Sequence, residues 1–180
     1  MDGWAVYQEL GRRIGKSDVF GGLQLVYFDT TTGFDLPQLP PEIPQPEVDM
    51  TEAGAGPFVE WDTRNNNLTP SSGFNVKASA MFLGSWLGGD NDFERYTGTA
   101  RFYWDPSPRF VLAARLQAQG VSGEAPFYAF PFIFLRGVPV MRYQGDKAVS
   151  VDGEVRWNAW RRWWVVAFAG AGWTDDAPGL

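Results

Sequence analysis

Residues 62–73 read Asp62-Thr63-Arg64-Asn65-Asn66-Asn67-Leu68-Thr69-Pro70-Ser71-Ser72-Gly73 and lie between two segments in which polar and apolar residues alternate. Such alternation places one set of side chains on each face of a β-strand. The connecting residues are typical of a turn: three asparagines, then a proline, then a glycine that tolerates positive φ. The stretch therefore predicts a β-hairpin.

The same alternation recurs along the chain and predicts eight strands, at residues 3–10, 19–30, 57–64, 73–86, 93–104, 110–120, 147–157 and 163–173. In residues 147–157, for example, one face carries Ser150, Asp152, Glu154 and Arg156, and the other carries Val149, Val151, Val155 and Trp157. Residues 11–18, 64–72, 105–109 and 158–162 form compact connections, whereas residues 33–56 and 121–146 are predicted to be long loops. Short turns at one end and long loops at the other are typical of outer-membrane β-barrels. We therefore expect an all-β antiparallel meander.

Composition fits a barrel wall better than a soluble β-sandwich. Aromatic residues make up 16% of the 180 residues, but no apolar run approaches the roughly 20 residues of a transmembrane helix. A barrel strand instead places its apolar residues at every second position. Aromatic residues near the predicted strand ends suggest the girdles found at membrane interfaces: Trp86, Tyr103, Trp104, Trp157, Trp160, Trp163 and Trp164.

The absence of cysteine and histidine excludes several kinds of site. The chain has no cysteine, which removes disulfides and thiolate metal ligands, and no histidine, which removes Ser-His and Cys-His nucleophilic systems. A net charge of −6 argues against a nucleic-acid partner. We therefore expect no enzyme, and no catalytic, cofactor-binding or metal-binding residue.

The hairpin turn resembles a turn of the BamA/TamA-like outer-membrane barrels, also called the bacterial surface antigen superfamily. The resemblance rests on Asp62, Thr63 and Arg64, followed at fixed offsets by Pro70 and Gly73. For Asp62 and Arg64 we expect a structural role, holding the turn by ionic and side-chain-to-backbone contacts.

A second resemblance lies in the later long loop, which contains Phe134-Leu135-Arg136-Gly137-Val138. In the family an Arg-Gly pair occurs in an extracellular loop that folds back into the barrel lumen, where the arginine meets acidic residues of the next two strands. Arg136 and Gly137 match that pair, and Glu154 matches the first acidic residue. The resemblance therefore implies a structural lock in the lumen made of Arg136, Gly137 and Glu154.

The second acidic position is occupied by Gly170, where family members commonly have Asp. The resemblance then implies either a simpler pairing or a substitute carboxylate, from Asp152 or Asp146. The aromatic run at residues 127–134 is expected to pack the loop inside the lumen.

The resemblance implies one partial barrel domain over residues 1–180, belonging to an integral barrel of about sixteen strands in the bacterial outer membrane. The N-terminus lacks a basic region followed by an apolar core, and the C-terminus reads as a loop, so we expect an internal segment. The implied function is to assist insertion, assembly or translocation of other outer-membrane proteins, with lipid and unfolded clients as partners. Two alternatives remain: a passive pore or membrane anchor for an attached domain, and a soluble β-sandwich binding module.

Overall fold

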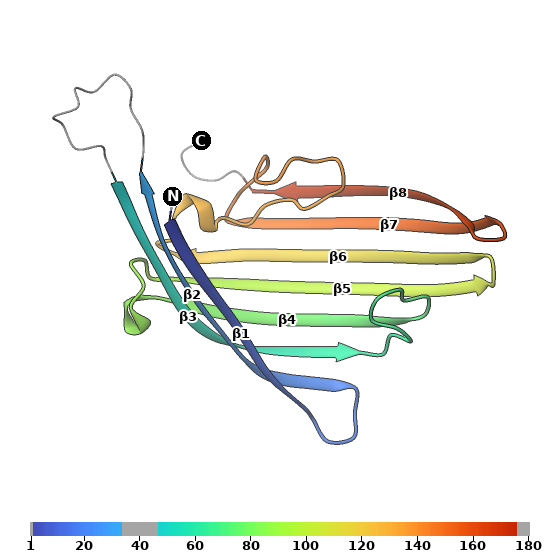
Figure 1. Cartoon of the computed structure of the whole chain (residues 1–180), viewed down its shortest axis with the longest axis horizontal. Helices are drawn as coiled ribbons and strands as arrows, with labels where there is room; N and C mark the ends of the chain where they lie inside the picture. Colours follow the sequence, from blue (N-terminus) through green and yellow to red (C-terminus); the bar gives the residue numbers. More distant parts are fainter. Residues whose placement is uncertain (1, 34–46, 176–180) are drawn as a thin grey trace.

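The computed structural model describes residues 2–33 and 47–175, and these form one antiparallel sheet whose strands follow chain order (Figure 1). The expected all-β meander of eight strands is confirmed. The strands are β1 (Asp2–Arg13), β2 (Val19–Gly33), β3 (Glu47–Asp62), β4 (Gly73–Leu83), β5 (Phe93–Ser107), β6 (Phe110–Gly123), β7 (Lys147–Trp160) and β8 (Trp163–Thr174). Two short 3-10 helices, η1 (Ser85–Leu87) and η2 (Phe127–Ala129), lie in the connections. No helix of the described residues is long and apolar enough to cross a membrane.

The strand register separates the side chains onto two faces. Lys77 of β4 lies opposite Thr99 of β5, and Gln117 of β6 lies opposite Ser150 of β7. We call this the polar face. The opposite, apolar face exposes large side chains, among them Leu23, Leu25, Val59, Trp61, Val76, Tyr96, Phe102, Trp104, Leu116, Val151, Val155 and Trp157. A soluble sandwich needs a second sheet to cover such a face, and the described strands all belong to one sheet.

The prediction of a loop over residues 33–56 is wrong for residues 47–56, which belong to β3. β3 begins at Glu47 and pairs with β2 from Gly33↔Glu47 to Val19↔Trp61. The sequence hides this because residues 53–56 read Ala-Gly-Ala-Gly, which shows no apolar alternation. Residues 34–46 lie outside the described part. The later loop is shorter than predicted, residues 124–146, because β6 extends to Gly123.

Phe58 of β3 lies on the polar face and is 6% exposed. The register aligns it with Gly22 of β2, which in turn lies opposite Gly11 of β1. A Cβ added to either glycine would lie 2.7 Å from a ring carbon of Phe58. The Lys77 Nζ lies 4.7 Å from the ring centroid on the β4 side, a cation–π distance. One ring therefore spans the first strands; β1 runs obliquely to β4–β8, and β2 and β3 bend from that oblique course to one nearly along β4 (Figure 1).

Candidate functional site

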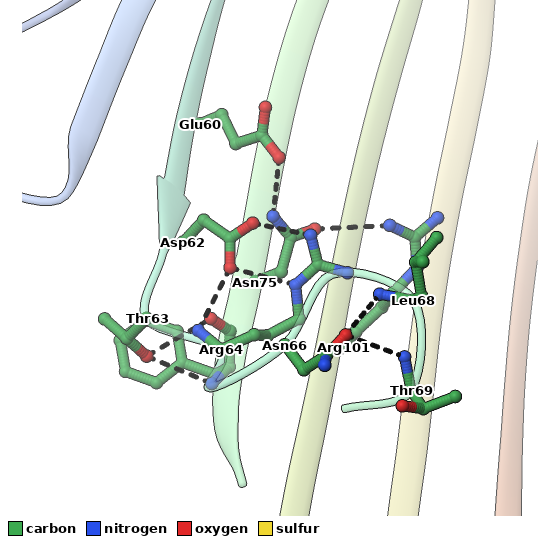
Figure 2. Close-up of polar contacts among 10 residues, drawn as sticks. Glu60, Asp62, Thr63, Arg64, Asn66, Leu68, Thr69, Asn75 and Arg101 are labelled. Atoms are coloured by element: carbon green, nitrogen blue, oxygen red, sulfur yellow. Dashed lines mark hydrogen bonds and ion pairs between the residues drawn. The ribbon is translucent and has the colours of Figure 1, made fainter. Parts of the chain in front are cut away.

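The β3–β4 turn is held at its base by a bidentate ion pair between Asp62 and Arg64 (Figure 2). Arg64 Nε donates to Asp62 Oδ1 at 2.9 Å, and Nη2 donates to Oδ2 at 2.5 Å. This hydrogen bonding raises the pKa of the Arg64 guanidinium above its ordinary value. Thr63 adds a second clamp, because its hydroxyl accepts from the Phe74 backbone N–H at 3.1 Å. Planar pairs of this kind fix orientation as well as energy.

The tip of the turn is organised by Asn66. Its Oδ1 accepts from the backbone N–H groups of Leu68, at 2.8 Å, and Thr69, at 3.1 Å (Figure 2). The chain then reaches Pro70, which is buried, and returns through Gly73 at φ +95. A left-handed φ strains other residues, so a glycine suits this return.

The turn does not stay beside its own strands but lies over the polar face. The Pro70 carbonyl accepts from Arg156 Nη1 at 3.2 Å, and Arg156 belongs to β7, three strands beyond β4. Ser71 Oγ lies 3.3 Å from Asp105 Oδ2 on the way across. Sequence reasoning predicted the turn but not this position.

The loop that contains Arg136 and Gly137, called here the Arg-Gly loop, also contacts β7 on the polar face. Arg136 Nη2 forms an ion pair with Glu154 Oε2, and the guanidinium carbon lies 4.6 Å from the ring centroid of Phe168 on β8. The Glu154 side chain is 9% exposed, whereas that of Arg136 is 48% exposed. Gly137 has φ +81, a conformation that favours glycine directly after the arginine. The structure thus brings Arg136 and Gly137 next to Glu154, and the role of these residues as a lock stays a prediction.

At Gly170, where the resemblance implied a second carboxylate, the structure has an apolar contact. A Cβ on Gly170 would lie 2.8 Å from Leu135 Cδ2, so the loop packs directly on β8. Asp152 pairs with Arg115 at 2.6 Å, and the ion pairs of the described residues give Arg136 no carboxylate besides Glu154. At this point the loop is held by the Arg136 ion pair, by apolar packing, and by Arg115 Nη2, which donates to the Phe134 carbonyl at 3.1 Å.

Glu154 also binds a second guanidinium. Arg156 Nε pairs with Glu154 Oε1, while Arg136 takes Oε2. Because Arg156 also donates to the Pro70 carbonyl, one continuous chain of contacts joins the turn motif to the Arg-Gly loop. The alternation of residues 147–157 places Arg156 on the polar face, but no motif marks it. Two cations on one buried carboxylate can hold two segments in position.

The start of the same loop contacts a distant strand of the sheet, β3. The Tyr128 hydroxyl donates to Glu52 Oε1 of β3 at 2.5 Å, and Asn91 Nδ2 donates to the same oxygen at 2.7 Å. Burial, and then this hydrogen bond, raise the pKa of Tyr128 above its ordinary value. The aromatic run packs only in part, since Phe127 is 73% exposed and Phe134 is 51% exposed.

The described residues hold no group of three or more acidic, histidine or cysteine side chains able to bind a metal. A cavity of about 420 Å³ lies on the polar face between β1–β2 and β4–β5, with Tyr7, Lys77 and Arg95 in its lining. It is separate from the contacts around Glu154.

Comparison with known proteins bears on the fold of the chain. The model of the Omp85 superfamily domain matches residues 51–132, and no curated protein matches the sequence. Among solved structures the chain is similar to the crystal structure of BamA from Haemophilus ducreyi lacking POTRA domains 1–3, at 12% identity and a TM-score of 0.66. The similarity covers 96% of this chain but 42% of that one, so this chain spans less than half of its length. The expected resemblance to a BamA/TamA-like barrel is confirmed: residues 51–132 are similar to the Omp85 superfamily domain, and the eight strands have the fold of part of a BamA-type barrel.

Proposed function

We propose that the chain forms part of the wall of an integral outer-membrane β-barrel of about sixteen strands that assists insertion, assembly or translocation of other outer-membrane proteins. In this proposal the apolar face meets lipid and the polar face lines the lumen. No reaction chemistry is involved, and no cofactor is needed. The observation that supports it best is the pairing of Arg136 with Glu154, because it holds a long loop on the polar face of an Omp85-like sheet.

The proposed role of these residues is mechanical. An assembly barrel offers strand edges to its client, and unpaired N–H and C=O groups at an edge template strand addition. The rest of the wall must keep its shape while one seam opens. Arg136, Gly137 and Glu154 would act as a structural lock that fixes the loop across the lumen, and the turn held by Asp62 and Arg64 would steady the other end.

Membrane residence is tested first, on the full-length gene product. An integral barrel stays in outer membranes washed with urea and changes its gel mobility on boiling. Release by urea, with no change in mobility, overturns the outer-membrane proposal.

The assembly role needs a second experiment. The full-length protein is reconstituted in lipid vesicles, and the folding of an added, urea-unfolded outer-membrane protein is followed by its heat-dependent gel mobility. We expect faster client folding than in empty vesicles, and a slower rate with Arg136→Gln. Arg109→Gln is the matched control, because Arg109 is exposed in the β5–β6 turn.

The alternative of a passive pore or membrane anchor predicts a different pair of results. Vesicles with the protein would then leak small solutes or simply carry the attached domain, and client folding would match empty vesicles. Acceleration that is equal for all variants would separate the assembly role from the lock.

A further inference from the structure

Arg156 is the one residue of the contact chain that touches both motifs. Its Nη1 donates to the Pro70 carbonyl of the β3–β4 turn at 3.2 Å, and its Nε pairs with Glu154 Oε1. The other carboxylate oxygen, Oε2, binds Arg136 of the loop. The guanidinium therefore divides its donors between a backbone group of one segment and one oxygen of Glu154.

These two contacts hold the planar guanidinium from opposite edges. Nη1, which meets the Pro70 carbonyl, lies on the edge away from Nε, and Nε holds Oε1 of Glu154. The turn therefore fixes the plane of Arg156, Arg156 fixes the carboxylate, and Oε2 is left facing Arg136. If the turn moves off, Arg156 and the Glu154 carboxylate can rotate, and the hold on Arg136 weakens. Arg136 is 48% exposed and can move into water at small cost.

We propose that Arg156 is a positioning residue that couples the β3–β4 turn to the Arg-Gly loop through Glu154. With the turn docked, Arg156 holds the Glu154 carboxylate with Oε2 toward Arg136, and the loop is held. With the turn released, Arg156 and the carboxylate can reorient, and the loop is loosened. This inference deepens the proposed function, on which it rests, by making the hold on the loop depend on the turn at the other end of the wall.

Asn66 offers a way to loosen the turn without touching the sheet. Its exposed side chain orders the tip next to Pro70 through the Leu68 and Thr69 amides, so Asn66→Ala should loosen the turn around Pro70. Asn67→Ala is the matched control, because Asn67 is exposed and makes no side-chain hydrogen bond in the described structure.

The readout is amide hydrogen exchange of the full-length protein in lipid, followed by mass spectrometry of peptides from the turn and from residues 133–138. We expect Asn66→Ala to speed exchange in both segments, by about 5-fold in the loop, which corresponds to losing about 1 kcal/mol of local stability. Asn67→Ala should leave both segments unchanged. A heat-dependent gel shift verifies that each variant has folded.

Arg156→Lys separates coupling from simple structural support. A lysine has a single nitrogen and lacks the rigid planar group that joins the Pro70 carbonyl to Glu154, so the state of the turn should no longer reach the loop. In the Arg156→Lys background, Asn66→Ala should therefore speed exchange in the turn alone. Coupling is reciprocal, so Arg136→Ala should speed exchange of the turn when Arg156 is present and not when lysine replaces it.

Two results overturn the inference. One is a loop unaffected by Asn66→Ala although the turn exchanges faster. The other is an equal loop response with arginine or lysine at position 156, which would place the coupling in the wall itself. Neither depends on client folding, so a failed assembly assay and a failed coupling remain distinguishable.

Discussion

Replacing Glu154 with glutamine is expected to be the most damaging conservative change in the loop contacts. The side chain is 9% exposed and accepts from two guanidiniums, Arg136 on one oxygen and Arg156 on the other. Glutamine keeps the shape but removes the charge, and its amide group turns N–H donors toward one of the two arginines. That arginine then loses its acceptor and faces a like charge without a carboxylate between them.

The magnitude follows from burial. Removing one partner of a buried ion pair costs about 3–5 kcal/mol. The low end applies here, because Arg136 is half exposed and can be hydrated when its partner is lost. We expect Glu154→Gln to lower the free energy of unfolding by about 3 kcal/mol.

The assay is urea-induced unfolding of the full-length protein in lipid vesicles, followed by tryptophan fluorescence. Asp18→Asn is the matched control: it makes the same chemical change in a pair with Arg13 that is 3.9 Å apart and more than half exposed. We expect the control to stay within about 0.5 kcal/mol of the parent. Equal effects of the two substitutions would refute the reasoning that burial gives the Glu154 contacts their strength.

Three further changes test neighbouring contacts in the same unfolding assay. Arg136→Ala should cost about 1 kcal/mol, less than Glu154→Gln, because the carboxylate keeps its second guanidinium; an equal cost would contradict this. Gly172→Ala should loosen the loop by about 1–3 kcal/mol, since its Cβ would lie 2.6 Å from Ile133 Cγ2, and faster exchange at residue 133 would report it. Tyr128→Phe should cost about 1 kcal/mol by removing the hydrogen bond to Glu52. Because folding raises the pKa of Tyr128 above 10.0, this contribution is complete below pH 10 and is lost as the pH rises further, so the difference between variant and parent should shrink there.

The sequence alone was sufficient to predict a strand where that strand has one apolar and one polar face. Residues 147–157 show this, and β7 lies there with Glu154 on the polar face. It failed for the first half of β3, where alanine and glycine carry too little side chain to reveal a period. Burial there comes instead from neighbouring elements, as at Ala53, which is 2% exposed where the η1 connection lies against it.

In the candidate site, too, some contacts could be predicted from the sequence and others could not. Arg136 and Glu154 were identified because a motif and a periodic strand mark them. The contact between Pro70 and Arg156 joins residues 86 positions apart, and it depends on how far the turn reaches across β5 and β6. The pairing of Asp152 with Arg115 lay within reach of the sequence, because the two residues lie directly opposite in the β6–β7 register.

Phe58 also restricts how the first strands can align while the wall assembles. A slip of one residue turns a strand's side chains to the wrong face. A slip of two keeps the faces but brings a larger side chain beneath the ring, in place of Gly11 or Gly22: Glu9, Arg13, Phe20 or Gln24. The ring leaves no space there even for a methyl group. Phe58 therefore disfavours shifted registers of β1 and β2 relative to β3. Strands that pair in a shifted register should separate and pair again.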